Sequence, residues 1–204
     1  MREILRIHVG VAAAWGFLLF ALPLWAAGPM EEIRTSTDQI LAILSDSELE
    51  APSKKQERLQ RLREVVNGRF DWEAISRGAL SQQWRELNDA QREEFTALFS
   101  KLVERTYMDR LEDHSVTELN EIRYVGEEVE GDRGRVRVEV VTDTKQEIPV
   151  EYRVRRKKSG WLVYDILIEG VSLVKNYRVQ FDEILMKSSY QELLVRLRAK
   201  VEEE

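Results

Sequence analysis

The spacing of the apolar residues changes twice along the chain, and this change constrains the fold more than any other feature of the sequence. From about residue 30 to 111, apolar side chains recur every three or four positions, as they do on one face of a helix. From about residue 121 to 168 they alternate with polar ones, as in RVRVEVV around Val136 and Val138. Helical spacing returns after Gly170. Helices followed by strands and then by helices predict an α+β domain.

The alternating segments are joined by short connections that contain Gly131–Gly134 and Ser159–Gly160. Short connections with glycine are typical of hairpins between neighbouring antiparallel strands. We therefore expect an antiparallel sheet of about four strands, covered on one face by the N- and C-terminal helices. Helices that cross a twisted sheet can leave space between the layers, so a cavity at this place is also expected.

Strict alternation in the segment WLVYDILI predicts that the last long strand has one apolar face. Because the side-chain period of a strand is two residues, a shift of one position would exchange the two faces. The residues assigned to the apolar face are Leu162, Tyr164, Ile166 and Ile168.

Residues 1–27 have the pattern of a signal peptide. Arg2 and Arg6 precede an apolar run of 14 residues, VGVAAAWGFLLFAL, and small residues then close the segment. The run is too short to span a bilayer as a helix, although an uncleaved membrane anchor is the alternative. We expect export, removal of this segment, and one soluble α+β domain over residues 28–204.

The charge and the reactive residues exclude several classes of function. The formal net charge of −6 becomes −7 once a segment with two arginines and one glutamate is removed, and an acidic surface repels nucleic acid. The chain has no cysteine, and His114 is the only histidine left after residues 1–27. Cys–His pairs and multi-histidine zinc sites are therefore impossible, so neither a metal nor a cofactor is expected.

Two charged patterns leave alternatives open. Asp165 or Glu169 beside an apolar strand face could act as a base, with Tyr164 polarising a carbonyl, and His114 could serve a nucleophile. The basic run Arg153–Lys158 is either a solvated hairpin that discourages edge pairing or a docking patch for an acidic partner or a lipid phosphate.

Four segments together resemble one family. They are FDWEAISRGALSQQWREL, QREEFTALFSKLVERTY, IPVEYRV and GWLVYDILIEGVSLVKNYRVQFDEI. They resemble the MlaC-like (toluene-tolerance Ttg2-type) periplasmic phospholipid-binding proteins of the Mla ABC transport system, and the likeness covers nearly all of the chain after residue 27. The chain departs from the family pattern at Ser81, where glycine is expected, and this affects a turn more than the proposed pocket.

The resemblance implies a soluble carrier that holds a phospholipid as cargo by its acyl chains. It implies exchange of that lipid with an inner-membrane ABC permease complex bearing an MCE-domain protein and with an outer-membrane lipoprotein complex, and it implies no catalytic residues. The two acyl chains of a phospholipid expose about thirty methylenes at about 0.8 kcal/mol each, so about 20 kcal/mol opposes free diffusion through water. A carrier would have to enclose both chains in carbon surface.

The lining of such a cavity is expected from the apolar stripes of the helices and strands. Aromatic and aliphatic stripes are also typical of an ordinary core, so two other functions stay open: a small enzyme with a hydrophobic pocket (an isomerase-like cone fold), and a protein-interaction module without a cavity. The expected lipid-binding residues are Trp72, Leu80, Trp84, Phe95, Phe99, Leu102, Val138, Val140, Val150, Tyr152, Leu162, Tyr164, Ile166, Ile168, Val171, Val174, Tyr177 and Phe181.

Overall fold

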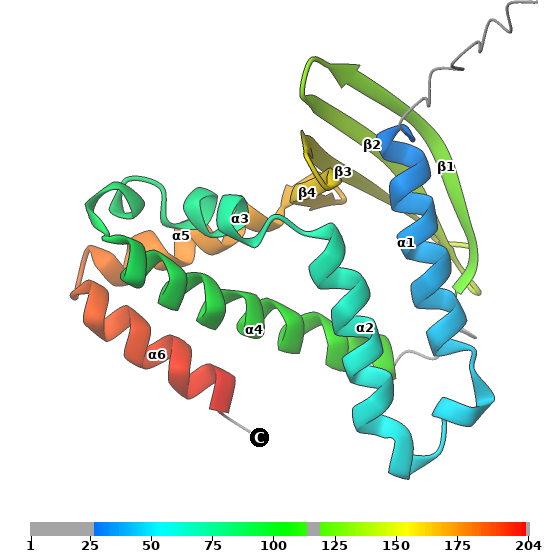
Figure 1. Ribbon diagram of the computed structural model, residues 1–204, viewed down its shortest axis with the longest axis horizontal. Coiled ribbons are helices and arrows are strands. Elements are labelled where there is room, and N and C mark those ends of the chain that lie inside the picture. The colour runs from blue at the N-terminus through cyan, green and yellow to red at the C-terminus, as the bar shows by residue number, and fades with distance from the viewer. Residues whose placement is uncertain (1–26, 114–118, 203–204) are drawn as a thin grey trace, which may run out of the picture.

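The computed structural model describes residues 27–113 and 119–202 (Figure 1). Six α-helices and five strands form an α+β fold, and short 3-10 turns at Ser47–Leu49, Pro52–Lys54 and Gln83–Glu86 link the helices. The helices are α1 (Pro29–Leu44), α2 (Lys55–Arg69), α3 (Trp72–Leu80), α4 (Asp89–Asp113), α5 (Leu173–Leu185) and α6 (Tyr190–Glu202). The strands are β1 (Leu119–Glu130), β2 (Arg133–Thr142), β3 (Glu147–Lys157), β4 (Gly160–Ile168) and β5 (Val171–Ser172).

The sheet is antiparallel throughout, in the order β1-β2-β3-β4-β5, which confirms the predicted fold class. The long strands are joined by hairpins, and the fifth strand has only two residues. Gly131 and Gly160 lie at the first and last of these hairpins with φ values of 62° and 113°. L-residues with a side chain rarely adopt such angles, which explains why glycine occupies these positions.

Strand β4 carries an extra residue, and β1 has two register shifts of its own against β2. Tyr152 of β3 pairs with Ile166 of β4, whereas Val154, two positions further along β3, pairs with Val163, three positions back along β4. This β-bulge leaves Tyr164 as the extra residue and reverses the alternation of β4 on its two sides. Val163 and Ile166 therefore face the same side of the sheet.

The prediction that the apolar residues of β4 share one face is wrong for this reason. Ile166 and Ile168 lie on the face of their partners in β3, but Leu162 pairs with Arg155 on the opposite face, and Tyr164 lies in the bulge. The side chains of β4 that are buried are instead Trp161, Val163 and Asp165.

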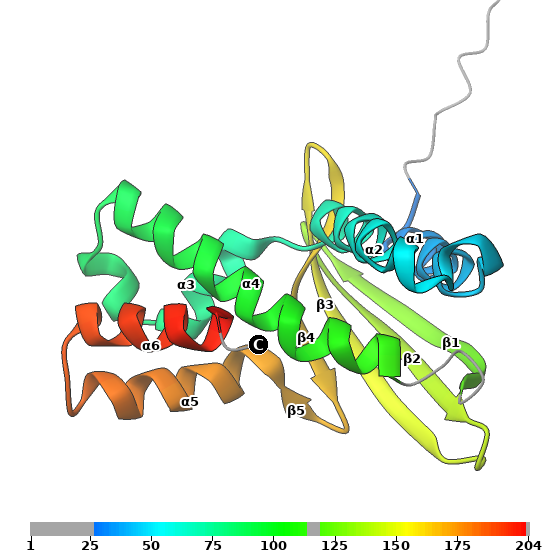
Figure 2. The same cartoon turned by 90° about the horizontal axis from the view of Figure 1, so that it is seen from below.

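Helix α1 lies along one face of the sheet, over β1 and β2 (Figures 1 and 2). Its Ile33 is buried with Val136, Val154, Trp161 and Val163, and these side chains form the core between α1 and the sheet. Each buried valine or isoleucine contributes about 1.5–3 kcal/mol, so this contact holds the helix on the sheet.

A second set of contacts joins the helices α1 and α2 to the start of β4. The carboxylate of Glu32 accepts a hydrogen bond of 3.1 Å from the backbone N–H of Trp161. It also forms an ion pair with Arg69 at the end of α2. The Arg69 guanidinium also donates to the Trp161 carbonyl at 2.8 Å and to the Ser36 hydroxyl at 2.9 Å. We call these four residues the Glu32 junction.

The other four helices gather beside the β4 edge of the sheet as a helical body, best seen in Figure 2. Its centre is aromatic. The ring centroid of Phe99 lies 4.9 Å from that of Tyr177 and 5.2 Å from that of Phe181, and both pairs are edge-to-face. The ring of Phe95 packs beside Phe99. Edge-to-face pairs of this kind stabilise a core by more than the burial of their area alone.

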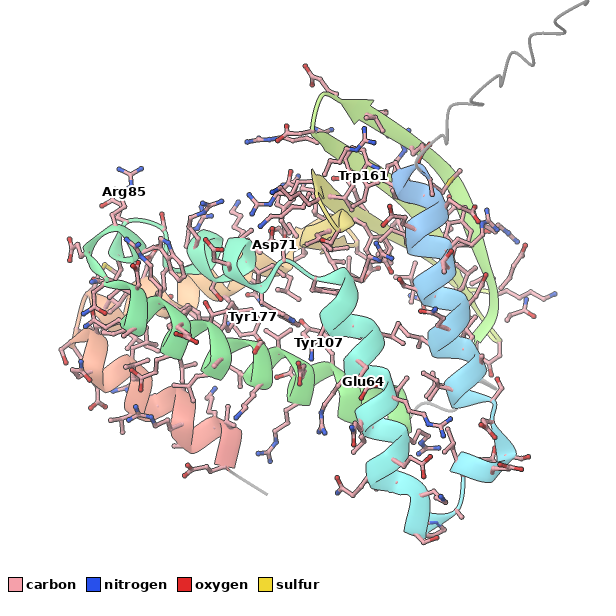
Figure 3. The ribbon with its side chains drawn as sticks, in the orientation of Figure 1. Glu64, Asp71, Arg85, Tyr107, Trp161 and Tyr177 are labelled. Carbon is pink, nitrogen blue, oxygen red and sulfur yellow. The ribbon has the colours of Figure 1, made fainter. Side chains whose placement is uncertain are left out.

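Asp71 connects the helical body to the sheet. Its backbone N–H donates to the Val163 carbonyl at 2.8 Å, and its side chain caps α3 by accepting from the Ala74 N–H at 3.1 Å. The same carboxylate forms ion pairs with two residues of β3, Arg155 (Nε at 2.6 Å) and Lys157 (Nζ at 3.0 Å). We call these contacts the Asp71 junction, and Figure 3 shows Asp71 between the helical body and the sheet.

Candidate functional site

The buried apolar side chains of the described residues form three separate clusters instead of one. One fills the helical body around Phe99, one lies between α1 and the sheet around Val163, and a small one lies between α1 and α2 around Leu62. A domain of this size usually has one contiguous core. The half-buried side chain of Phe70 packs against both of the two larger clusters and lies between them.

Half-buried apolar side chains border the clusters on the side where the sheet, α1 and α2 meet. On the sheet they are Ile122, Tyr124, Tyr152 and Ile166, which pack against the core under α1. On the two helices they are Ile40, Ile43, Leu44 and Val66, which pack against the small cluster. We call these eight residues the inter-cluster surface.

Tyr152 is the most informative member of this surface. Burial raises the pKa of Tyr152 to about 12, and the neighbouring Tyr124 adds to the rise. The side chain nevertheless keeps accessible surface, and no residue of the described chain forms a hydrogen bond with its hydroxyl. A half-buried tyrosine whose hydroxyl has no hydrogen-bonded partner among the described residues has the environment expected of a residue that lines an apolar space.

The structure divides the predicted lipid-binding residues between two places. The residues of α3, the following turn, α4 and α5 lie in the helical body, where they contact one another, with Trp72 half-buried at its margin. This group comprises Leu80, Trp84, Phe95, Phe99, Leu102, Val174, Tyr177 and Phe181. Their role as a lipid lining stays a prediction.

The strand residues of the prediction are more dispersed. Val138, Val150 and Tyr152 share a face of β3 and β2 with Ile166, and Val140 lies half-buried further along β2. Leu162 and Tyr164 are separated from them by the bulge described above. Ile168 and Val171 lie at the end of the sheet, and 40% and 64% of their surface is exposed.

Two cavities open on the helical body on either side of Trp84. The larger, about 490 Å³, is bordered by Trp84 and by charged residues that include Arg92 and Glu93. The smaller, about 280 Å³, is bordered by Trp84, Arg77, Arg85 and Arg178. Neither of these two cavities lies between the sheet and the helices, so the predicted lipid cavity at that place stays a prediction.

The acid–base alternative finds no support in the positions of its residues. Asp165 is buried and accepts hydrogen bonds from the Ser172 hydroxyl at 2.7 Å and the Val174 N–H at 3.1 Å, so it caps the start of α5. Glu169 is exposed in the turn after β4, with a φ of 50°. His114 lies outside the described residues. The two carboxylates therefore do not meet in an enclosed cleft.

The basic run Arg153–Lys158 is largely engaged within the molecule. Arg155 and Lys157 belong to the Asp71 junction, and Arg153 pairs with Glu151 at 3.2 Å. Burial alone would raise the pKa of Asp71, but the hydrogen bonds from Lys157 and Arg155 and from the α3 backbone outweigh burial and hold this pKa below its usual range. Arg155 and Lys157 therefore stabilise the contact between β3 and α3, whereas the ion pairs of Arg153 lie within the sheet.

Comparison with known proteins agrees with this architecture. A family model described as "MlaC protein" matches residues 34–199. The chain belongs to the MlaC family. A solved structure of the same fold is the phospholipid-binding protein from Ralstonia solanacearum in complex with a phospholipid, with a TM-score of 0.72 and 24% sequence identity over 86% of this chain and 97% of that chain. Curated proteins give no match.

Other properties of this MlaC-family chain concern metals and membranes. Within residues 27–113 and 119–202, no three or more His, Asp or Glu side chains come together in a way that could hold a metal ion. Across the same residues, no helix has both the length and the apolar character needed to cross a bilayer.

Sequence reasoning did not select most of the inter-cluster surface. Ile122 and Tyr124 alternate with charged residues in the segment EIRYV, which forms part of β1. Ile40 and Leu44 are four positions apart and so lie on one face of α1, but a helical face alone does not reveal what it packs against. The alternation of β1 was therefore the signal that could have added two further residues to the site.

Proposed function

We propose that this protein is a soluble periplasmic phospholipid carrier that takes up acyl chains between the sheet and the helices α1, α2 and α4. The observation that carries the proposal is the inter-cluster surface, with Tyr152 deep in the molecule, accessible and without a hydrogen-bonded partner among the described residues. Family membership supports it, since the structure of similar fold from Ralstonia solanacearum is a phospholipid-binding protein with bound phospholipid.

Hydrocarbon is the ligand that this surface fits. Isoleucine, leucine and valine supply most of its carbon, and the two tyrosines add aromatic faces with one polar atom each. Half-buried side chains at the margin of a cluster lose few contacts when two clusters move apart. An acyl chain that enters there replaces water on both sides and gains about 0.8 kcal/mol for each methylene that it buries.

Helix α4 gives this region its third wall. Its second half runs from the helical body past α2 towards the sheet, and Figure 3 shows Tyr107 where α4 passes α2. Tyr107 is half-buried against the helical body. Movement of α4 and α2 relative to the sheet would thus widen the space beside the inter-cluster surface without opening the core of the helical body.

The sequence and the family membership support a route for the carrier. Residues 1–27 would direct export and be removed, and residues 28–204 would form the lipid-binding domain. The lipid would be exchanged with an inner-membrane ABC permease complex containing an MCE-domain protein and with an outer-membrane lipoprotein complex. No catalytic residue is assigned, because Asp165 serves as a helix cap.

The experiment that tests the proposal measures lipid transfer between two vesicle populations, with fluorescent phospholipid in the donor vesicles. Tyr152→Asp and Ile166→Asp should reduce the transfer rate by about tenfold or more, because an ionised carboxylate beside an acyl chain must be desolvated. Val179→Asp is the matched control, since this valine is 50% exposed on α5. It should leave transfer unchanged.

A variant that adds carbon instead of charge separates a blocked space from a misfolded protein. Ile166→Trp keeps the surface apolar but fills volume beside it, so transfer should fall while the thermal unfolding temperature changes little. Transfer at the wild-type rate in all three site variants would show that the acyl chains lie elsewhere. Absence of transfer by the wild-type protein would overturn the carrier function itself.

A further inference from the structure

Three arginines that have no ion-pair partner among the described residues lie around one cavity. At least eleven other arginines of the described chain form ion pairs with Asp or Glu. Arg77, Arg85 and Arg178 form none among the described residues, yet all three border the cavity of about 280 Å³ on the helical body. On a chain with a net charge of −6, this concentration of uncompensated positive charge requires an explanation.

The lining of this cavity contains no acidic side chain. Beside the three arginines it consists of Gly78, Ser81, Gln82 and Trp84. Trp84 is 6% exposed and gives the cavity an aromatic floor, while Gln82 and Ser81 add groups that can form hydrogen bonds. The cavity therefore has the composition of an anion site: a carbon base, neutral hydrogen-bonding groups and several guanidinium groups.

Close packing of α3 on α5 holds these residues together. A Cβ atom on Gly78 would lie 2.7 Å from Val174 Cγ1, so only glycine permits this approach. Because α3 and α5 are this close, Arg178 of α5 can donate its Nε–H to the Gly78 carbonyl at 2.8 Å. Ser81 then turns the chain with a φ of 51°, which carries it into the 3-10 turn that bears Arg85.

Roles within the fold account for these arginines only in part: Arg77 lies in the last turn of α3, and Arg178 bonds to a carbonyl there. Arg178 completes the hydrogen bonding of a carbonyl near the end of α3, and cations are favourable at a helix C-terminus. The side chains of Arg77 and Arg85 have no hydrogen bond or ion pair among the described residues, and both are exposed. Figure 3 shows Arg85 projecting outward at the end of the helical body remote from the sheet.

We propose that this cavity, the Arg77–Arg85–Arg178 pocket, is a docking site for an acidic segment of a partner protein, with an Asp or Glu carboxylate seated between the guanidinium groups. Charge complementarity selects the partner, because guanidinium groups bind carboxylates in bidentate geometry. The inference goes beyond lipid carriage and does not depend on it. It leaves the inter-cluster surface free, since the pocket lies on the helical body and the inter-cluster surface adjoins the sheet.

A protein segment fits the surroundings better than a membrane does. The exposed acids Glu73, Glu86 and Asp89 lie on α3, the 3-10 turn and the start of α4, close in the chain to Arg77 and Arg85. A flat anionic bilayer would meet these carboxylates together with the arginines and be repelled by them. A narrow segment can place one carboxylate in the concave pocket and avoid them.

The test measures binding of a fluorescently labelled hexaglutamate peptide to the purified protein at low salt. The double variant Arg77→Gln/Arg85→Gln should weaken binding about tenfold or more, because it removes charge-assisted hydrogen bonds. Arg133→Gln is the matched control: this arginine is exposed on β2, has no ion pair among the described residues and is remote from the pocket, so binding should change less than about twofold. Both substituted arginines are exposed, and the thermal unfolding temperature should stay constant.

Four results would overturn the proposal. Equal weakening by Arg133→Gln would show general attraction to charge in place of a site. Displacement of the peptide by an equal concentration of inorganic phosphate would indicate a site for a free oxyanion. Binding to phosphatidylglycerol vesicles that requires Arg77 and Arg85, with no peptide binding, would assign the pocket to a membrane. Loss of lipid transfer in the double variant, with normal peptide binding, would show that the arginines bind the transported phospholipid and not a partner protein.

Discussion

Replacing Asp71 with asparagine is expected to weaken the connection between the helical body and the sheet. The Asp71 carboxylate is 4% exposed and accepts hydrogen bonds from Arg155 at 2.6 Å and from Lys157 at 3.0 Å. Asparagine keeps almost the same shape and is itself a good N-cap, so it preserves the bond to the Ala74 N–H. The substitution therefore keeps the cap of α3 but replaces Oδ2, which accepts from both Arg155 and Lys157, with an NH2 group that can accept from neither.

The size of the effect follows from these contacts. A hydrogen bond to a charged group contributes about 1.5–3 kcal/mol, and the lower part of that range applies because the Arg155 and Lys157 side chains are 24% and 37% exposed. Asp71→Asn should thus reduce the free energy of unfolding by about 2–3 kcal/mol. Asp71→Ala also removes the cap of α3 and should reduce it by about 1 kcal/mol more.

Urea denaturation followed by circular dichroism measures this difference. For a domain of this length, a loss of about 2–3 kcal/mol lowers the midpoint by about 1 M at unchanged slope. Asp89→Asn is the control, because Asp89 pairs with Arg92 at 3.1 Å while its own side chain is fully exposed, and its midpoint should not move. A loss below about 0.5 kcal/mol for Asp71→Asn would refute the reasoning that this junction joins the two parts of the fold.

Three further predictions concern other contacts of the fold. Ser81→Gly should raise the free energy of unfolding by about 1 kcal/mol, because Ser81 adopts a φ of 51° that glycine accepts without strain; an unchanged or lower thermal unfolding temperature would contradict it. Glu32→Gln should weaken the Glu32 junction by about 1–3 kcal/mol and speed hydrogen exchange in α1 more than in α6; equal exchange in both helices would count against it. The pKa of Asp71 is lowered in the folded state, so its ionised carboxylate should contribute fully to the free energy of unfolding above about pH 5, and this contribution should be lost as the pH falls below about 4. Curves of the free energy of unfolding against pH that run parallel for wild type and Asp71→Asn would contradict this.

The fold could be predicted where one local pattern decides the structure. The repeat of apolar residues from Phe95 to Tyr107 specified α4, and the alternation of Val136 and Val138 specified β2. Glycines at the turns specified the hairpins and hence an antiparallel sheet. In each case the signal lies within a few residues of the element that it determines.

The orientation of β4 could not be predicted because it depends on a helix that follows in the chain. Asp165 must reach the Val174 N–H at the start of α5 on one side of the sheet, while Val163 and Ile166 enter the core on the other. An extra residue at Tyr164 satisfies both requirements. No local property of WLVYDILI shows this, so strict alternation gave the wrong face to half of the strand.

The candidate site was only partly predictable for a similar reason. Tyr152 and Ile166 were selected as apolar strand residues, and both lie on the inter-cluster surface. Phe99 and Tyr177 were selected by the same criterion but pack in the aromatic centre of the helical body. Apolar character alone does not distinguish a filled core from the wall of an internal space, because that difference depends on how the helices and the sheet are placed.

Native mass spectrometry of the protein purified from the periplasm tests lipid carriage most directly. The account predicts a mass that exceeds that of the polypeptide by a bound phospholipid, released on denaturation and identified by lipid extraction. It also predicts that Ile166→Trp lowers the lipid-bound fraction while Val179→Asp leaves it unchanged. A protein that is free of lipid after purification and that takes up none from phospholipid vesicles would contradict the account.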